Sequence, residues 1–550
     1  MVACPIMNAG WNYETTPGEK HHPQLICFED DHLLVINKPP SLSTHSPHPY
    51  AGEGIYEWLR NRQADWRPLA IIQRLDKETS GLLVFGKTSL ANRSLTQQFS
   101  SHNVRKKYVF LTDREVKPTR FTAISALTRV GDKYLSRPLH AGGNRAETHF
   151  QLLNSSNGRS LVEAHPVTGR THQIRVQAST AGFPILGDTL YNGTPAKRLC
   201  LHALELAFNH PITGATVNFH TPVDFDYDPR LWLRTALIRA DSTDAYRIVH
   251  GASEGFPGWY VDRLGDFLLS QGKEWPTPDQ TDLLTRWQAE LCLAGVYHKI
   301  LNRRVRETTL DIASPQWMCG QVAPPRFIAR ENGLEFELSF NEGYSSGLFL
   351  DQRENRRRLL VGYVGADFGC IAVGGQSQEI LNTFAYTCGY SVCAAKAGAR
   401  VTSLDLSRKY LDWGKRNFVR NQIDPAAHEF ICGDVFDWLR RFHRKERKFA
   451  VIILDPPIFS TSKISGPFRI EKDYPALVAL ALPLLQSNGV LFASANASGS
   501  QPAEFLESIA SSIRACGRTI VQQHYAAQPP DFPVSRLEPA YLKTVWLRVA

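Results

Sequence analysis

A chain of 550 residues is too long for one hydrophobic core and is expected to form about three domains. Hydrophobic residues make up 43% of it and charged residues 21%, an ordinary globular composition that excludes a largely disordered or fibrous protein. The first residues lack a basic region followed by an apolar stretch. No apolar run approaches the ~18 residues of a membrane span, so we expect no membrane partner.

The net charge is +9, and the positive excess is concentrated in residues 51–200, which hold 22 lysines and arginines against 11 aspartates and glutamates. Such a basic region is typical of a nucleic-acid binder, although anionic metabolites or lipid surfaces would also suit it. The 10 cysteines are scattered, with no CxxC pair and no zinc-like spacing, so the sequence predicts neither a disulfide framework nor a metal site. This cysteine usage favours a reducing cytoplasm.

The first part of the chain, residues 1–229, predicts a mixed, largely antiparallel α+β domain. Short β-like runs alternate with turns in HLLVINKPP and LAIIQRLDKETSGLLVFGK. Further strand-like runs follow at KKYVFLT, RAETHFQLL and SLVEAHPVTGRTHQIRV. The acidic segment before Pro229 is the expected border.

Two more domains are expected after this border. Residues 230–330 combine the strand-like, turn-rich YRIVHGASEGFPGWYVDRLGDFLLSQ with the helix-like TDLLTRWQAELCLAG, which indicates a small α+β domain. In residues 331–550, apolar strands alternate with amphipathic helices, as in VTSLDLS followed by RKYLDWGKRNFVRN. That rhythm predicts a doubly wound, Rossmann-like α/β sheet.

Six runs in the first part stand out by their order and spacing. They are INKPP (36–40), RLDKETSG (74–81), KKY (106–108), VTGRTHQIRV (167–176), GFPILGDTLY (182–191) and LHA (201–203). RLDKETSG alone would be read as a solvated charged turn, since exposed ion pairs are common and contribute little. Together, the six runs resemble the RluA-type pseudouridine synthases over roughly residues 25–225.

The resemblance implies roles for four residues and no cofactor. Asp76 would be the nucleophile that attacks the target uridine, at the ribose or at the base. Arg175, expected on a strand, would pair with it, and Tyr108 would stack on the flipped base and accept its proton. Arg74 would fill the gap left in the helix or hold a phosphate. The family usually has histidine where this chain has Gln73, which affects packing or RNA contact more than chemistry.

The doubly wound part predicts a cofactor site at the carboxyl ends of its strands, where such sheets bind nucleotides. The first strand, EILN, leads into TFAYTCGYS, so we expect Phe384, Tyr386 and Gly389 to lie against the cofactor, with the glycine allowing close approach. Asp405 ends the second strand and can bind ribose hydroxyls, and Asp434 is placed to meet the adenine. Either aspartate could instead be a helix N-cap.

The fourth strand carries the strongest signal of this half. VIILDPPIF brings Asp455, Pro456 and Pro457 to the site, followed by the aromatic Phe459. In nucleic-acid methyltransferases such an arrangement positions the target base and stacks on it, although a proline after a strand is also a common stop signal. Asp455 is therefore expected to act in catalysis and to contact the cofactor.

FLDQRENRRRL, LNTFAYTCG, DLSRKYLDWGKRN and DPPIFSTSK together resemble the large-subunit rRNA methyltransferases named Rlm, with S-adenosylmethionine as cofactor. The N7-guanine type is nearest, while the middle segment is similar to the C5-cytosine type. Cytosine C5 methylation requires a cysteine nucleophile, and the strand after DPP reads Ser494-Ala495-Asn496. Guanine N7 has a free lone pair, so methylation of a guanine nitrogen is favoured, with C5-cytosine as the alternative.

The sequence thus predicts a bifunctional enzyme that forms pseudouridine and methylates a base in structured RNA. Ribosomal RNA is the favoured substrate, and transfer RNA is the alternative. A different class stays open: an RNA-binding or ribosome-assembly factor in which one site has degenerated. DNA or a small molecule as methyl acceptor is disfavoured by the fusion.

Overall fold

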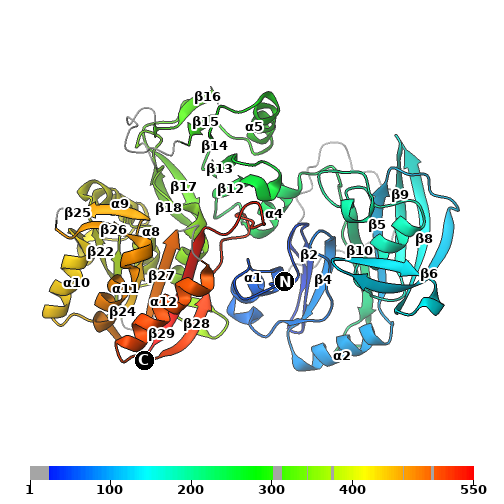
Figure 1. The fold of residues 1–550 in the computed structure, drawn as a ribbon, viewed down its shortest axis with the longest axis horizontal. Coiled ribbons are helices and arrows are strands. Elements are labelled where there is room, and N and C mark those ends of the chain that lie inside the picture. Colours follow the sequence, from blue (N-terminus) through cyan, green and yellow to red (C-terminus); the bar gives the residue numbers. More distant parts are fainter. Residues whose placement is uncertain (1–23, 302–312, 343–344, 373–376, 463, 497–500) are drawn as a thin grey trace.

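The computed structural model describes residues 24–301, 313–342, 345–372, 377–462, 464–496 and 501–550. Three larger sheets, of 11, five and seven strands, follow one another along the chain and lie on the right, at the top and on the left of Figure 1. Among the residues that the structure describes, no helix combines the length and apolar character needed to span a bilayer. The domain borders expected at residues 229 and 330 stay predictions.

The 11-stranded sheet is antiparallel except for the pair β4 and β10, which confirms the expected mixed α+β architecture. Two helices cover opposite faces of its β2–β4 pair: Leu34 and Ile36 pack on the α1 side, whereas Leu33 and Val35 pack on the α2 side. Because successive strand residues point to opposite faces, a strand buried on both reads as a continuous apolar run. The strands and helices of this part are β1 (Ile26–Glu29), β2 (Leu33–Lys38), α1 (Ile55–Arg60), β3 (Ala70–Ile71), β4 (Ser80–Gly86), α2 (Ser89–Ser100), β5 (Arg105–Thr112), β6 (Arg120–Val130), β7 (Lys133–Arg137), β8 (Asn144–Ser156), β9 (Arg159–Pro166), α3 (Gln173–Thr180), β10 (Leu201–Asn209) and β11 (Thr216–His220).

The expectation that Arg175 lies on a strand is wrong, because HQIRV opens helix α3. Residues 173–178 of this helix are all buried. A short segment buried on every side has no polar face, and periodicity alone cannot separate such a helix from a buried strand. The extended segment thus ends with β9 at Pro166, and α3 lies against β7, β8 and β6.

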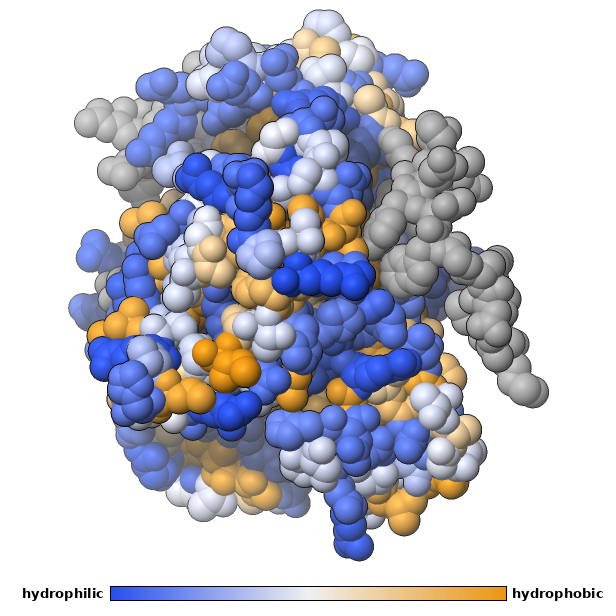
Figure 2. Space-filling view, turned by 90° about the vertical axis from the view of Figure 1, so that its right-hand side faces the viewer, coloured by the Kyte–Doolittle hydropathy of each residue, from blue (hydrophilic) through white to orange (hydrophobic). Residues whose placement is uncertain are grey.

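A mainly hydrophilic surface covers the end of the molecule formed by the 11-stranded sheet, with apolar side chains in small separate patches (Figure 2). Exposed basic residues on β6, β7, β8 and the turn before α3 contribute to the surface of this part. They are Arg120, Arg129, Lys133, Arg137, Arg145 and Arg170. The positive excess of residues 51–200 is therefore displayed to solvent, as a polyanion partner requires.

The five-stranded sheet has the order β12-β13-β14-β15-β16 and contains one parallel pair, β14 and β15, joined through α5. Helix α5 begins with a capping box in which Thr277 and Gln280 exchange side-chain-to-backbone hydrogen bonds, with Pro278 at its first position. A separate hairpin, β17–β18, leads into the last part. The elements are α4 (Pro229–Leu237), β12 (Ala245–His250), β13 (Tyr260–Leu264), β14 (Phe267–Gly272), α5 (Pro278–Glu290), β15 (Gly295–Ile300), β16 (Gln316–Gly320), β17 (Phe327–Glu331) and β18 (Leu334–Leu338).

The seven-stranded sheet confirms the predicted doubly wound architecture, with the order β23-β22-β21-β24-β27-β29-β28. The first five of these strands run parallel to one another. Strand β29 runs antiparallel to both of its neighbours, β27 and β28. Strands β22 and β23 are added on one side of β21, and β24 is added on the other side. The carboxyl ends of β21 and β24 therefore flank the topological switch point, where such sheets typically bind ligands. The elements are α7 (Arg353–Val361), β19 (Tyr363–Gly365), β20 (Phe368–Gly369), β21 (Glu379–Thr383), α8 (Gly389–Lys396), β22 (Arg400–Asp405), α9 (Arg408–Arg420), β23 (Glu429–Cys432), α10 (Val435–Arg444), β24 (Phe449–Leu454), β25 (Phe459–Ser462), β26 (Gly466–Arg469), α11 (Ile470–Ala481), β27 (Leu485–Asn496), α12 (Pro502–Ala515), β28 (Ile520–Tyr525) and β29 (Leu542–Val549).

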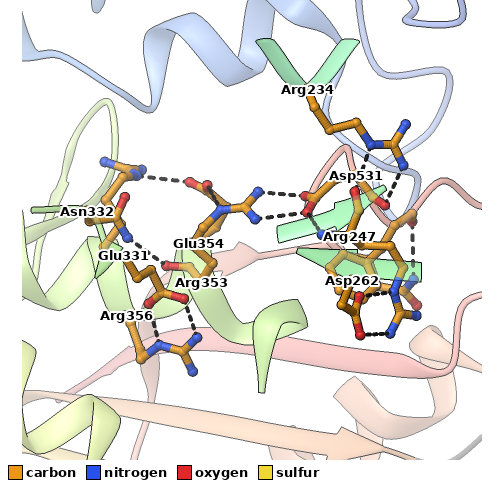
Figure 3. Close-up of polar contacts among 12 residues, drawn as sticks. Arg234, Arg247, Asp262, Glu331, Asn332, Arg353, Glu354, Arg356 and Asp531 are labelled. Atoms are coloured by element: carbon orange, nitrogen blue, oxygen red, sulfur yellow. Dashed lines mark hydrogen bonds and ion pairs between the residues drawn. The ribbon is translucent and has the colours of Figure 1, made fainter. Parts of the chain in front are cut away.

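Buried ion pairs hold helix α7 in place. Arg356 makes two hydrogen bonds of 2.6 Å to Glu331 of β17, and the two side chains are 3% and 0% exposed. Arg353 binds Asp531, from the loop before β29, through two further hydrogen bonds of 2.8 and 2.6 Å. Figure 3 shows both pairs. The two arginines lie on the same helix, and their carboxylate partners come from different parts of the chain.

Replacing Glu331 by glutamine should lower the free energy of unfolding by about 3–5 kcal/mol, because it leaves the buried Arg356 guanidinium without its carboxylate. Urea unfolding followed by circular dichroism measures this. The matched change at exposed Glu335 of β18 should alter stability by no more than about 0.5 kcal/mol. Equal stability of the two variants would contradict the assignment of a structural role to the pair.

Candidate functional sites

The first site is built around the turn that carries Asp76, between β3 and β4. Buried Leu75 anchors this turn: its carbonyl accepts a hydrogen bond of 2.8 Å from the Thr44 hydroxyl, and its amide donates back to that oxygen. The buried Lys38 ammonium donates to the carbonyls of Pro39, Leu42 and Lys77. Asp76 is thereby presented from a fixed backbone.

An arginine lies between two carboxylates at this site. Arg175 donates from Nε and Nη2 to Asp188, at 2.7 and 2.9 Å, and from Nη1 to Asp76 Oδ2 at 3.3 Å. The Asp188 side chain is 1% exposed and that of Asp76 is 25% exposed. Asp188 therefore holds the guanidinium, and Asp76 keeps a face open to a ligand.

Two residues that the sequence argument did not single out complete this arrangement. His172 Nε2 lies 3.8 Å from Asp76 Oδ2, and His172 Nδ1 lies 2.8 Å from the Tyr191 hydroxyl. The Tyr191 ring also stacks against the Arg175 guanidinium at 5.2 Å. Like Asp188, both residues belong to the runs VTGRTHQIRV and GFPILGDTLY, so the signal was present in the sequence.

A cavity of about 530 Å³ opens beside these groups, large enough for a nucleotide base. Asp76, Arg175 and Asp188 line it, with Arg198 and Leu199 on another wall. Tyr108, on β5, is partly buried and packs against the core that contains Leu75, and its pKa is raised by burial and by the charge of Asp76.

Arg74 lies apart from the polar cluster. Its side chain is exposed, and it is not among the residues that line the cavity. Gln73 donates from Nε2 to the Leu82 carbonyl at 3.5 Å, so it lies against β4. Arg74 therefore faces the surface, and Gln73 faces the sheet.

A buried histidine, His202, and the cavity residue Arg198 both contact the Ser80 hydroxyl. His202 Nδ1 lies 2.8 Å from the Ser80 hydroxyl, and Nε2 lies 3.1 Å from the Thr221 carbonyl. The carbonyl can only accept, so Nε2 carries the proton and the ring is neutral. Burial, together with the nearby Arg198 charge, lowers the pKa of His202 to about 3.

The second site lies at the carboxyl ends of β21 and β22. In the loop after β21, Phe384, Tyr386 and Cys388 have φ values of 53°, 48° and 64°. Side-chain-bearing residues rarely adopt this left-handed conformation, and such strain often accompanies a functional loop. Asp405 secures the loop by accepting from the Tyr386 amide at 2.9 Å and from the Ser407 amide at 2.8 Å.

Gly389 begins helix α8 beside this loop. A Cβ at this position would come within 3.2 Å of Arg356 Cδ on α7. The close neighbour of the glycine in the structure is therefore a side chain of α7. Asp434, at the end of β23, is the N-cap of α10, accepting from the Asp437 amide and from the Ser465 hydroxyl.

Asp455 follows β24 and faces a polar group of buried residues. Gln352 Nε2 lies 3.4 Å from Asp455 Oδ1 and donates to the Ser494 hydroxyl at 2.9 Å. Burial raises the pKa of Asp455 to about 6; the Ser494 hydrogen bond lowers it, and the charge of Asp351 raises it further. Asp351 accepts from the Tyr541 hydroxyl at 3.0 Å.

The residues after Asp455 reach the surface. Pro456 is buried, whereas Pro457 is exposed and Phe459, at the start of β25, is 41% exposed. The exposed Phe459 ring, four residues after the partly buried Asp455, offers a flat surface for a planar ligand. In the part of the chain that the structure describes, no group of three or more His, Cys, Asp or Glu side chains is placed to hold a metal ion.

Two protein families match this chain. Residues 32–180 match the family described as RNA pseudouridylate synthase, and residues 247–548 match the family described as S-adenosylmethionine-dependent methyltransferase. The chain belongs to the S-adenosylmethionine-dependent methyltransferase family. It joins a methyltransferase part to a pseudouridylate synthase domain and is an enzyme with two activities.

Curated relatives cover the methyltransferase part. The ribosomal RNA large subunit methyltransferase of Deinococcus radiodurans is 32% identical over 312 residues, 56% of this chain and 73% of the relative. The ribosomal RNA large subunit methyltransferase I of Citrobacter koseri is 31% identical over 58% of this chain and 77% of its own. A solved structure with SAH, provisionally described as a methyltransferase, is 27% identical over 63% of this chain and 88% of that chain, with a TM-score of 0.49.

The buried histidines predict that acid destabilises the fold. Burial lowers the pKa of His202, His250 and His524 to about 3. Between about pH 6.5 and 3 the unfolded chain binds protons that the folded chain does not, so stability falls as the pH decreases through this window. Urea unfolding at several pH values should give a slope that His202→Gln reduces by about 1.4 kcal/mol per pH unit. Exposed His140→Gln serves as control and should leave the slope unchanged.

Proposed function

We propose that this enzyme converts a specific uridine of structured RNA to pseudouridine at the first site and methylates a base of RNA at the second. The observation that carries the proposal is the pairing of Asp76 with Arg175 in an open cavity, on a chain whose other half has the methyltransferase architecture. Ribosomal RNA is the favoured substrate because the curated relatives act on it by name, and transfer RNA is the alternative.

At the first site, the Asp76 carboxylate forms a bond to the target uridine at the ribose or at the base. The bond between ribose C1′ and uracil N1 breaks, the uracil turns, and a bond between C1′ and C5 forms as the carboxylate is released. The C5 proton is then lost and N1 gains one. Arg175, 3.3 Å away, stabilises the negative charge of the carboxylate whenever it is free.

Two other residues of the synthase domain have proposed roles. We propose that Tyr108 stacks on the displaced base and accepts the C5 proton; burial and the charge of Asp76 raise its pKa and favour the neutral phenol, so stacking is the better supported of these two roles. Arg74, exposed and outside the cavity, is free to contact the phosphate backbone or the space left by the uridine. We propose that this reaction needs no cofactor.

At the second site, the residues fit S-adenosylmethionine. Asp405 uses two hydrogen bonds to fix the loop and keeps lone pairs for ribose hydroxyls. Phe384 and Tyr386 lie on the strained loop, Gly389 begins the helix that follows it, and Asp434 ends the neighbouring strand, where an adenine would lie. The bound cofactor supplies the methyl group as a sulfonium, and the protein orients its acceptor.

For the methyl acceptor we propose a guanine nitrogen, N7 first. Asp455 positions the base, Pro457 and the exposed Phe459 ring provide a stacking surface, and the buried Pro456 fixes the backbone between them. Methylation of cytosine C5, the alternative, needs a thiolate. Burial raises the pKa of Cys388, next to the cofactor loop, to about 12, which makes this thiol a poor nucleophile and supports nitrogen methylation.

Single substitutions should separate the two reactions. Asp76→Ala should abolish pseudouridine formation and leave methylation intact, and Asp455→Ala should do the reverse, because each carboxylate serves one site. The measurement is mass spectrometry of nucleosides from rRNA and tRNA, from cells lacking the gene and from unmodified RNA treated with enzyme and S-adenosylmethionine. Loss of both activities in either folded variant would contradict independent sites.

Methyl transfer should also depend on pH through Asp455. Its pKa of about 6 means that lowering the pH below this value protonates the carboxylate, which removes its charge and turns one acceptor oxygen into a hydroxyl donor facing the base. Single-turnover methylation at saturating cofactor and RNA should therefore fall by about tenfold per pH unit below 6. Pseudouridine formation by the same sample is the internal control, and a flat methylation profile between pH 5 and 7 would exclude this role.

A further inference from the structure

Helix α1 of the synthase domain and its flanking residues contact helix α7 of the methyltransferase part directly. Arg62 donates to Glu354 at 2.7 Å, and Arg358 donates to Glu53 at 3.1 Å. Arg357 bridges both segments, since it donates to the Asn61 carbonyl at 2.7 Å and to Glu354 at 3.0 Å. The contacts between the two segments join residues about 300 positions apart in the sequence. On α7 they are made by Glu354, Arg357 and Arg358.

The contact is buried and charged. The side chains of Glu354 and Arg358 are 6% and 2% exposed. Burial opposes the charge of Glu354, but the surrounding arginines, Arg62 foremost, outweigh this and hold the pKa of the carboxyl well below its usual value. The pair therefore stays ionised at any ordinary pH, and separating it would leave an uncompensated charge in the interior.

Aromatic and charged side chains from both parts gather at the same junction. Trp58 and Arg62 of the synthase domain line one small recess together with Arg353 and Asp531. The Arg62 guanidinium also stacks on the Trp58 ring at 4.3 Å. Figure 3 shows the continuation on the methyltransferase side, where Arg353, bound to Asp531, and Glu354 occupy the start of α7. A displacement of α1 would therefore be transmitted to α7.

Helix α7 begins next to the proposed methyl-transfer site. Gln352, the residue before the helix, is the one that contacts Asp455 and Ser494. Its side-chain oxygen accepts from Asn355 at 2.8 Å, and Asn355 in turn accepts from Trp546 at 3.0 Å. Contacts with α7 and β29 thus set the orientation of Gln352. This residue precedes Glu354, the partner of Arg62, by two positions.

We propose that the segment Glu53–Arg62 of the synthase domain positions the methyl-transfer site, acting through α7 and Gln352 on Asp455. This inference rests on the proposed role of Asp455. Methyl transfer then requires the folded synthase domain as a structural partner but not its chemistry. Arg62 and Glu53 are positioning residues, because neither touches the reacting groups.

The test compares Arg62→Met with Arg60→Met in the full chain. Arg60 is the last residue of α1, two positions before Arg62, but it donates to the Arg67 carbonyl within the synthase domain. Arg62→Met should lower kcat for methyl transfer on the order of tenfold, with the KM for RNA changed less than twofold, because small misplacements cost rate more than binding. Pseudouridine formation should stay at the parent rate in both variants.

Two further comparisons separate positioning from general destabilisation. Arg62→Lys keeps the charge and should recover most of the lost rate. Glu53→Gln should reproduce the defect, whereas Glu57→Gln should not, because Glu57 accepts from the Ser46 amide inside the synthase domain. A parallel loss of pseudouridine formation in Arg62→Met or Glu53→Gln would overturn the proposal.

Hydrogen exchange gives a readout that does not depend on methyl transfer. Amides of residues 353–358 should exchange faster in Arg62→Met than in the parent, while those of α3 should not change. Unchanged exchange in α7, or an unchanged kcat, would refute the inference. If the parent protein methylates no RNA, the proposed function fails, and the exchange comparison still decides whether α1 restrains α7.

Discussion

Helix α7 buries seven consecutive residues, Arg353 to Leu359, and four of them are arginines. A guanidinium is stable in the interior only when carboxylates or carbonyls surround it, so each arginine requires a partner at a defined place. The partners come from separate parts of the chain: β17, the loop before β29 and the synthase domain. Satisfying the charges of one helix therefore brings these parts together, and the site at Asp455 is assembled at the start of that helix.

The two sites place a carboxylate in opposite electrostatic surroundings. Asp76 is partly exposed and lies beside the Arg175 cation, which Asp188 holds in place through two hydrogen bonds. Asp455 is close to a second carboxylate, Asp351, and its pKa is raised to about 6. A nucleophile needs its charge in order to attack, whereas a carboxylate that orients a base needs to be ionised only at the near-neutral pH above its pKa of about 6. The surroundings agree with the roles proposed for each.

Much of the fold could be predicted from the sequence because local patterns report burial. The strands that end at Asp405 and Asp455 and the helix capped by Ser407 lie where the apolar runs indicated. Helix α3 was missed because a segment buried on all sides has no periodicity. RENRRRLL would be read as a solvated basic helix, since its partners lie up to 305 residues away and no local pattern records them. The same holds for Gln352, whose contact with Asp455 depends on tertiary packing.

A packed helix begins at the border expected between the two enzymes. Helix α4 begins at Pro229, and its Trp232, Leu233 and Leu237 belong to the core around α1, while Leu231 packs in the core of the five-stranded sheet. A flexible linker would let each site search for its own nucleotide independently, whereas this helix and the α1–α7 contact fix the two sites relative to each other. An RNA that serves both must then either present the two nucleotides at that fixed separation or bind twice. Because buried ion pairs are costly to break, the protein keeps the two sites in place. An RNA that binds twice must therefore itself move from one site to the other.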